Sequence, residues 1–365
     1  MRSIQRAIST LTSMEMKLSH EISGSKISVA VIQMCSINNK ISNLLTISRL
    51  ISTAVQNSNS RLQFACLPEC CIFMGKTRTE TVSAAECIIP VPTTNNALKF
   101  VELFQKYLHC NNPSDIELHS KSLMNSFDGI ESINTMQCLS IIAAKYNIWL
   151  SVGGFPEIYQ KENSSEPTGK IFNSHVMIDC NGKIVSPIYR KVHLFDSPMA
   201  GLFESQLTQP GERGVLMQNM FSRWAVGLSV CYDLRFPALY DALSRSSSSG
   251  GVDIVLVPSA FTPKTGEAHW EVLLRARAIE NQCYVLAAAQ SGEHNDQRRS
   301  HGYSLIVDPW GTVLARLGDE KEGICYAELD RTVVDNLRRD MPVGTHKRLD
   351  VYGMPVEVTD CSHRI

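Results

Sequence analysis

The sequence predicts an α/β protein, and two patterns carry this prediction. Short runs that are apolar almost throughout recur along the chain, as expected for strands that are covered on both faces. Between some of these runs lie stretches whose apolar residues fall on one helical stripe. Strands that alternate with helices are typical of α/β architectures. The pattern alone leaves open whether the strands form one doubly wound sheet or two stacked sheets.

The expected elements follow from these runs in order. Strands are expected at residues 27–34, 63–67, 148–152, 226–230, 253–257, 283–289 and 304–307. Helical stripes cover residues 43–55 and 270–279. Residues 172–187 instead form two alternating runs that meet at Asn181-Gly182, a dipeptide that favours a tight hairpin turn. We therefore expect a hairpin of two strands there.

Three segments fall outside this alternation. Residues 1–25 carry Arg2 and Arg6, no acidic residue before Glu15 and an apolar helical face, which is the profile of a mitochondrial transit peptide. The alternative is a disordered N-terminal segment without a targeting function. Residues 88–123 are polar with a weak helical patch, and we interpret them as a surface insertion, because lengthening a loop costs little entropy. Residues 354–365 are interpreted as a tail, which leaves residues 26–353 as the main domain.

Composition excludes several classes of partner. The chain is 44% hydrophobic and 19% charged, with a net charge of −1 and no basic stretch with interleaved aromatics, so nucleic acid is not an expected partner. No apolar run approaches the roughly 20 residues that cross a bilayer, so no membrane association is expected. Twelve cysteines lie scattered without pattern, as in proteins of a reducing compartment. We therefore expect a cytoplasmic protein, with a mitochondrial form if residues 1–25 are a transit peptide.

Metal binding is not expected either. The tightest cysteine cluster, Cys66, Cys70 and Cys71, lacks the paired spacing of structural zinc sites. No glycine-rich segment matches a phosphate-binding motif. The sequence therefore predicts no metal and no organic cofactor.

Three expected strands end close to a reactive side chain. The run FACLPE ends at Glu69, IYRK ends at Lys191 and GLSVC ends at Cys231. The carboxyl ends of strands in α/β sheets border the crevice where sites assemble. A glutamate can take the proton of a thiol and return it to a leaving amine, and a fixed lysine can bind an oxyanion. The lysine should also lower the pKa of the thiol.

Each of the three also has an ordinary explanation. Glu69 could be a carboxylate at a helix start, Lys191 a solvated surface group and Cys231 an inert packing residue. Their spacing in the sequence does not establish that they meet in space.

The segments CLPE, YRKVHLFD and SVCYDLRFP resemble, in this order, three signatures of the nitrilase superfamily of carbon–nitrogen hydrolases. The resemblance runs from about residue 26 to residue 353 and is interrupted by residues 88–123. It implies a single α-β-β-α sandwich without cofactor, paired through a helix face into a homodimer or higher homo-oligomer. It further implies that Glu69 accepts a proton, Lys191 stabilises the oxyanion and can donate a proton, and Cys231 is the nucleophile. A supporting glutamate falls on Glu204 within GLFES, with Glu212 as the competing candidate.

The substrate follows less directly from the resemblance. Stretches such as WLSVGGFPE and DMPVGTHKRLDVYG are similar to the branch that hydrolyses deaminated glutathione to 2-oxoglutarate and cysteinylglycine. The branch of ω-amidases, which act on α-keto acid amides, is similar to the same stretches and stays open, as does another carbon–nitrogen hydrolase specificity. An inactive interaction scaffold is a further alternative, although a scaffold has no need for all three catalytic side chains.

Four residues are candidates for binding the substrate. An α-keto carboxylate would need a cation, and Arg235 lies four residues after Cys231; a salt bridge to Asp233 is its alternative role. Tyr232 supplies a backbone N–H beside the nucleophile, which we expect to share the oxyanion with the lysine. His269 and Trp270 come just before an expected helix and could line the pocket or pack at the helix start.

Overall fold

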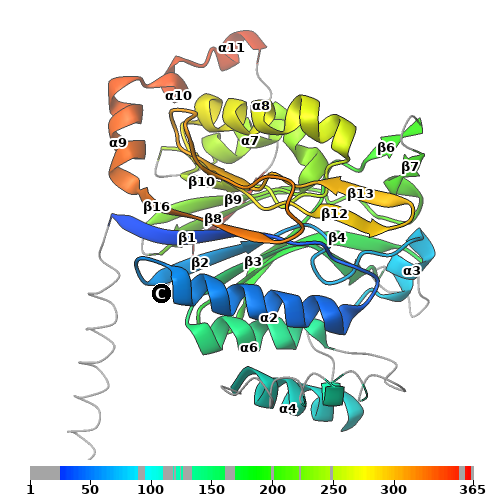
Figure 1. Ribbon diagram of the computed structural model, residues 1–365. Helices are drawn as coiled ribbons and strands as arrows, with labels where there is room; N and C mark the ends of the chain where they lie inside the picture. The colour runs from blue at the N-terminus through cyan, green and yellow to red at the C-terminus, as the bar shows by residue number, and fades with distance from the viewer. Residues whose placement is uncertain are drawn as a thin grey trace, which may run out of the picture.

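Two β-sheets lie face to face in the computed structural model, and helices cover the outer face of each sheet (Figure 1). The structure describes residues 25–88, 95–109, 118, 121–123, 125, 134–160, 169–198, 201–221, 223–246, 250–352 and 358–362. The order of layers is helix, sheet, sheet, helix. The expected α-β-β-α sandwich is therefore confirmed, and the doubly wound single sheet is excluded.

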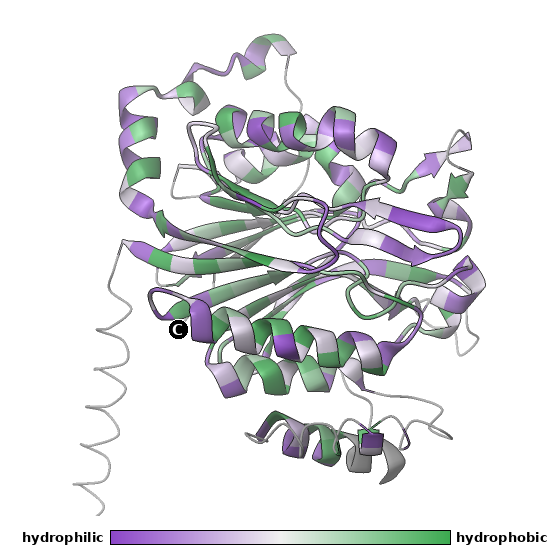
Figure 2. Ribbon diagram, viewed as in Figure 1, coloured by the Kyte–Doolittle hydropathy of each residue, from purple (hydrophilic) through white to green (hydrophobic). Residues whose placement is uncertain are grey.

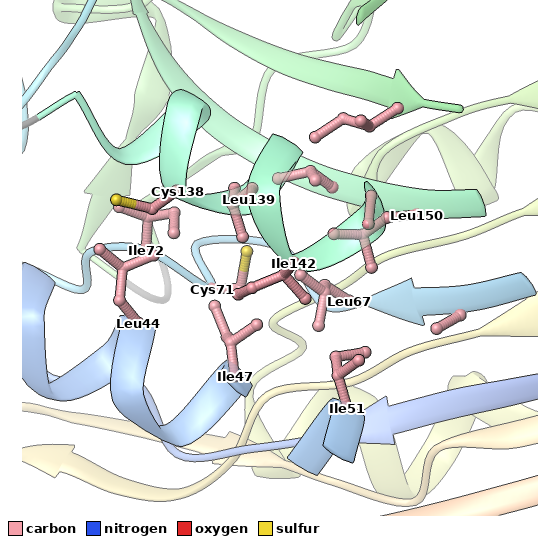
Figure 3. Packing of buried hydrophobic residues seen from close by; sticks show 14 of the residues in the cluster. Leu44, Ile47, Ile51, Leu67, Cys71, Ile72, Cys138, Leu139, Ile142 and Leu150 are labelled. Carbon is pink, nitrogen blue, oxygen red and sulfur yellow. The ribbon is translucent and has the colours of Figure 1, made fainter. Parts of the chain in front are cut away.

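The first sheet has the strand order β16-β1-β2-β3-β4-β5. Its strands are β1 (Lys26–Gln33), β2 (Leu62–Leu67), β3 (Trp149–Ile158), β4 (Ile171–Ile178), β5 (Ile184–Arg190) and β16 (Gly323–Asp330). The β1, β2 and β3 strands run parallel, whereas β4, β5 and β16 pair in antiparallel fashion. Helices α2 (Lys40–Asn57) and α6 (Thr135–Tyr146) cover its outer face, where Figure 3 shows Leu44 and Ile47 packed near Leu139 and Ile142.

The second sheet has the order β15-β14-β11-β10-β9-β8-β17. Its strands are β8 (Gly214–Met220), β9 (Trp224–Leu228), β10 (Ile254–Leu256), β11 (Tyr284–Ala287), β14 (Leu305–Val307), β15 (Val313–Arg316) and β17 (Val358–Ser362). The neighbouring β9, β10 and β11 strands run parallel. Helices α7 (Pro237–Arg245) and α8 (Pro263–Asn281) cover this sheet, and α9 (Arg331–Asp340), α10 (Val343–His346) and α11 (Leu349–Tyr352) follow the last strand of the first sheet.

Alternation along the strands divides the core into three layers. On β1, Val29 and Val31 point between the sheets, while Ala30 and Ile32 point toward α2 and α6. On β10, Ile254 and Leu256 belong to the layer between the sheets, and their neighbours pack under the helices of the second sheet. Figure 2 shows the resulting apolar strands enclosed between the two helix layers. Because both faces of these strands are covered, their sequences are apolar throughout, which is why they could be predicted.

One end of the sandwich gathers the short elements. These are α3 (Arg78–Ser83), the paired strands β6 (Asp196–Ser197) and β7 (Leu202–Phe203), the 3₁₀ turns η2 (Glu204–Gln206) and η3 (Cys231–Arg235), and the hairpin of β12 (Ser291–Asn295) and β13 (Arg298–His301). Figure 1 shows α3 and both strand pairs at this same end. Several loops therefore converge where β2 and β9 terminate.

The hairpin expected at residues 172–187 is confirmed, since β4 and β5 meet at a turn in which Gly182 has a φ of +82°. The helix expected at residues 270–279 exists, but it begins at Pro263. A proline at the first helical turn has its φ preset for a helix, whereas the polar residues that follow it lack an apolar stripe. His269 and Trp270 therefore lie within α8, and the expectation that they precede the helix was wrong.

The remaining segments complete the chain. Within the segment expected as an insertion, α4 (Asn95–His109) buries Val101, Phe104 and Leu108 in the cluster under α2 and α6. The expected tail contributes β17, which pairs in parallel with β8. Residues 1–24, where a transit peptide was expected, lie outside the described residues. In the described part of the chain, no helix is both long and apolar enough to cross a membrane.

Candidate active site

The convergent loops enclose a pocket of about 430 Å³. Glu69, Lys191 and Cys231 all line it. Glu69 lies two residues after β2, Lys191 follows β5 directly, and Cys231 begins the turn after β9. The structure thus brings together three residues whose proximity the sequence could not establish. The first two come from one sheet and the third from the other.

The Glu69 backbone is held from two sides. Its carbonyl oxygen accepts a hydrogen bond of 2.9 Å from Gln290 Nε2. Gly154, in the β3 strand, has a φ of +65°, and a Cβ there would lie 2.4 Å from Glu69 Cγ. Only glycine fits this close approach to the carboxylate-bearing side chain. Gly154 therefore has a steric role beneath Glu69, whereas a Cβ on its neighbour Gly153 would meet the Pro258 ring.

Lys191 lies in a buried ionic cluster with two glutamates. Its side chain is 3% exposed, and Nζ is 3.1 Å from Glu69 Oε1 and 2.9 Å from Glu204 Oε2. The η2 turn supplies Glu204, whose carboxylate also accepts a bond from the Phe195 backbone N–H at 2.8 Å. Glu212 is exposed instead. Of the two candidates for the supporting glutamate, the structure places Glu204 against the lysine.

Asn173 is a member of the site that the sequence analysis missed. Its Nδ2 donates to Glu69 Oε1 at 2.9 Å and to Glu204 Oε1 at 3.0 Å, and its backbone oxygen accepts from the Lys191 N–H at 2.8 Å. It therefore orients both carboxylates and the lysine. The only sequence signal was a polar residue in a strand of mixed polarity, where Ser174 and His175 are polar as well.

Cys231 occupies a strained turn. Its φ is +47°, in the left-handed region that a cysteine rarely adopts, and its backbone N–H donates to the Pro258 oxygen at 2.9 Å. The turn is fixed by the buried Asp233 carboxylate, which accepts bonds from the hydroxyl of Tyr189 at 2.7 Å and from His193 Nδ1 at 2.8 Å. These two donors flank Lys191 in the sequence, so Asp233 ties the nucleophile turn to the lysine segment.

The charges of the site follow from burial and pairing. Burial raises the pKa of the Cys231 thiol well above its usual range, and the Glu69 carboxylate raises it further. Lys191 lowers it, as expected, but does not outweigh these two effects. Burial alone would lower the pKa of Lys191, yet Glu204 and Glu69 hold it well above its usual range. Burial disfavours the charge of Glu69, but Lys191 and hydrogen bonds from Cys231 and Asn173 keep its pKa below the usual value. At rest the site therefore holds a thiol, a carboxylate and an ammonium.

The four substrate-binding candidates separate into two groups. Tyr232 and Arg235 line the pocket, and the Arg235 guanidinium lies 5.4 Å from the centre of the Phe261 ring. The expected alternative partner of Arg235, Asp233, is occupied by other donors. His269 contacts Arg235 Nη1 at 3.1 Å from the exposed face of α8 but does not line the pocket. Trp270 is buried, and its indole N–H donates to the Tyr303 oxygen at 2.7 Å, so it is a packing residue.

Ten cysteines of the described ranges are free thiols. Cys70 lines the pocket beside Glu69, and burial raises its pKa to about 12. Among the residues that the structure describes, no group of three or more His, Cys, Asp or Glu side chains could hold a metal ion.

Comparison with known proteins places this site in a family. The family model for carbon–nitrogen hydrolases matches residues 28–339. The human protein named deaminated glutathione amidase is 46% identical over 217 residues, which are 58% of this chain and 63% of that protein. The Dictyostelium discoideum protein of the same name is 46% identical over 215 residues, 58% of this chain and 70% of that protein. The chain thus spans less than two thirds of the human relative.

Two solved structures share the fold and part of the sequence. The Caenorhabditis elegans NitFhit protein is 33% identical with a TM-score of 0.65, over 90% of this chain and 66% of that one. Saccharomyces cerevisiae Nit3, a member of branch 10 of the nitrilase superfamily, is 29% identical with a TM-score of 0.62, over 87% of this chain and 94% of that one. The family match includes Glu69, Lys191 and Cys231 and all the strands of both sheets apart from the start of β1 and the whole of β17. The chain belongs to the carbon–nitrogen hydrolase family.

Proposed function

We propose that this protein is a thiol amidase that hydrolyses the amide bond of deaminated glutathione. The observation that carries the proposal is the convergence of a buried carboxylate, a buried ammonium and a strained thiol in one pocket. Cys231 is the nucleophile, Glu69 the proton acceptor and Lys191 the cation that stabilises the oxyanion. Family membership and the names of the relatives support the same chemistry.

The first half of the reaction forms a thioester. Because the resting thiol is protonated and Glu69 is ionised, Glu69 takes the thiol proton as the sulfur attacks the amide carbonyl. The negative charge that develops on the carbonyl oxygen lies between the Lys191 ammonium and the Tyr232 backbone N–H. As the tetrahedral intermediate collapses, Glu69 returns the proton to the nitrogen and the amine leaves.

The second half hydrolyses the thioester. Glu69, ionised again, removes a proton from water, which attacks the acyl carbon. The same two donors bind the oxyanion, and the Cys231 sulfur leaves with the proton held by Glu69. The products are 2-oxoglutarate and cysteinylglycine. Glu204 and Asn173 keep Glu69 and Lys191 in register throughout both halves.

Arg235 supports an α-keto acid as the acyl part. The guanidinium lines the pocket, lies against aromatic rings and has no carboxylate partner among the described residues. An arginine can bind a carboxylate through two charge-assisted hydrogen bonds. In Arg235→Lys, which cannot make the bidentate pair, KM for α-keto acid amides should rise sharply while the thermal stability barely changes. A fall in stability, with equal losses for amides that lack the carboxylate, would assign Arg235 to the loop instead.

The test of the substrate is a direct comparison. The purified full chain is incubated with deaminated glutathione and, separately, with the ω-amide of 2-oxoglutarate, and released 2-oxoglutarate is measured. A higher kcat/KM for deaminated glutathione supports the proposal. A higher value for the simple ω-amide would make the protein an ω-amidase, and hydrolysis of neither would contradict the proposed function.

Assembly into a homodimer or higher homo-oligomer is part of the proposal. Val272 and Ile279 on the outer face of α8 are exposed, and so is Trp310 in the turn before β15. Gly311, next to this tryptophan, packs directly on Ile279, so the exposed apolar side chains lie close together. Such patches mark interaction surfaces. Light scattering should give a mass above that of one chain, and Val272→Glu should lower it.

The proposed location is the cytoplasm, with a mitochondrial form that depends on residues 1–25. The free cysteines of the described ranges suit a reducing compartment. Fluorescently tagged chains with and without these residues distinguish the two locations. A mitochondrial signal that disappears on truncation supports the second form, and a cytoplasmic signal from both chains contradicts it.

A further inference from the structure

The β12–β13 hairpin carries a cation that the proposed reaction does not use. Arg298 begins β13 directly after the hairpin turn, and its half-buried side chain lines the same pocket as Glu69 and Cys231. In the described part of the chain, no ion pair or side-chain hydrogen bond engages its guanidinium. A guanidinium has five N–H donors, and holding them unpaired in a half-buried place is costly. Its donors are therefore available to an anion in the pocket.

The β12–β13 hairpin that carries Arg298 lies against Glu69, since Gln290, directly before β12, donates to the Glu69 carbonyl oxygen at 2.9 Å. Its positive charge acts on the Glu69 carboxylate and on the Cys70 thiol, the next residue along the chain. Arg235 lies elsewhere, against the rings of Phe261 and Tyr232. Since Glu69 must hand its proton to the departing nitrogen, the amine leaves on the Glu69 side. Arg298 is thus a cation beside the leaving group, and Arg235 is a cation for the acyl part.

Two further cations, Lys76 and Arg78, line the pocket on this side. Lys76 Nζ is 3.2 Å from Asp296 Oδ1, and this ion pair joins the segment before α3 to the turn of the β12–β13 hairpin. Arg78, the first residue of α3, also lines the pocket and uses Nη1 to bind Gln206 Oε1 at 2.8 Å. Figure 1 shows α3 and the hairpin at the same end of the sandwich. Lys76 is therefore neutralised by its partner, while Arg78 and Arg298 keep donors toward the pocket.

We infer that Arg298, assisted by Arg78, binds a carboxylate carried by the departing amine. When the amine is a dipeptide such as cysteinylglycine, this group is its terminal carboxylate. The inference rests on the proposed function and extends it to leaving-group specificity: amides whose amine part ends in a carboxylate are preferred over those that release a neutral amine. A substrate with a carboxylate at each end thereby meets one arginine at each end of the pocket.

The experiment uses two substrates that differ only at that carboxylate. Both have the 2-oxoglutaryl group joined to cysteinylglycine, and the second ends in a carboxamide. We expect the wild-type chain to favour the carboxylate form in kcat/KM by about tenfold or more. In Arg298→Gln, kcat/KM for the carboxylate form should fall by about tenfold to one-hundredfold, mainly through KM, so that the preference disappears. Any effect of Arg298 on Glu69 acts on both substrates and cancels in their ratio.

Two further variants sharpen the result. Arg298→Lys keeps the charge and should retain part of the preference. Arg316→Gln on β15 removes an exposed, ion-paired arginine outside the pocket and should leave both substrates unaffected. Equal losses for both substrates in Arg298→Gln, or no preference in the wild type, would overturn the inference while hydrolysis itself upholds the amidase. If the wild type hydrolysed neither substrate, the proposed function would fail and this inference with it.

Discussion

Two buried ionic clusters in this molecule have similar parts and different surroundings. In the pocket, Lys191 lies between Glu69 and Glu204. Between the start of β10 and α9, the fully buried Asp253 lies between Arg331, whose Nε is 3.0 Å away, and Arg338, whose Nη1 is 2.9 Å away. The first cluster has two anions for one cation, whereas in the second one buried anion lies between two cations, of which Arg331 also pairs with the exposed Asp335.

The difference lies in what each cluster leaves available. Both oxygens of Asp253 accept bonds from protein donors, including the Ala225 N–H at 2.8 Å, and the cluster clamps a helix to a strand. The pocket cluster instead borders a 430 Å³ cavity and a thiol. Asn173 Oδ1, beside it, is buried and has no hydrogen-bond partner among the residues that the structure describes. Burial and charge alone therefore do not make an active site; a nucleophile and an open side are needed as well.

Removing the nucleophile should give the largest effect. Cys231→Ala should lower kcat by about 10⁴-fold or more, because no thioester can form. The free energy of unfolding should change by less than about 1 kcal/mol, since only one small atom is lost. Steady-state kinetics and urea unfolding measure the two quantities. Turnover near the wild-type rate would contradict the mechanism.

Changing the shape of the central cation should come next. Lys191→Arg keeps the charge, but a planar guanidinium does not replace a compact ammonium between two carboxylates. We expect kcat to fall by about 10²-fold or more, the scale of a lost oxyanion donor. Rapid-quench mass spectrometry should show slower formation of the acyl adduct on Cys231. A normal kcat in the arginine variant would show that the reaction does not need the ammonium of Lys191.

The second cluster should respond in the opposite way. Asp253→Asn leaves Arg338 without its anion and Arg331 paired only with Asp335, so it should lower the free energy of unfolding by about 3–5 kcal/mol. The activity per folded molecule should stay the same, because the cluster does not border the pocket. Urea unfolding and assays at low temperature test both halves of the expectation. Lost activity with unchanged stability would contradict the conclusion that the Asp253 cluster is structural and only the Lys191 cluster is catalytic.

The smallest effect concerns Asn173 and pH. The pKa of Glu69 lies below its ordinary value of 4.5, so the base stays ionised and kcat/KM should fall only below about that pH. Asn173→Ala removes a hydrogen bond that lowers this pKa, so the acidic limb of the profile should move to higher pH. Asn336→Ala, at an exposed position of α9, is the control and should leave the limb in place. A limb that does not move in Asn173→Ala would show that this bond does not tune Glu69.

The sequence predicted those parts of the site that follow buried strands. Glu69 and Cys231 come shortly after runs that are apolar on both faces, and such runs can be recognised in the sequence without any knowledge of the fold. The sandwich itself came from resemblance, because a local pattern does not tell one sheet from two. The start of α8 was missed since its first residues are polar.

The contacts that complete the site have no local signal. Asn173 lies 104 positions from Glu69 in the sequence, and the two meet because β2 and β4 belong to the same sheet, with only β3 between them. Glu204 could not be separated from Glu212 because a loop, not a strand or helix, decides which of them turns toward Lys191. Trp270 was proposed for the pocket because the sequence places it near a helix start and does not show which face of α8 is covered.

The base Glu69 follows a strand of the first sheet, and the nucleophile Cys231 follows a strand of the second. The packing between the sheets therefore also sets the distance between these two catalytic groups. Phe64 on β2 and Leu228 on β9 belong to the layer that separates the two sheets, close in sequence to Glu69 and Cys231. The thickness of that layer therefore determines the distance over which the proton passes from Cys231 to Glu69. A methylene added or removed there would alter the distance between carboxylate and sulfur by a fraction of an ångström. We expect such a change to lower the reaction rate more than it lowers the stability of the fold.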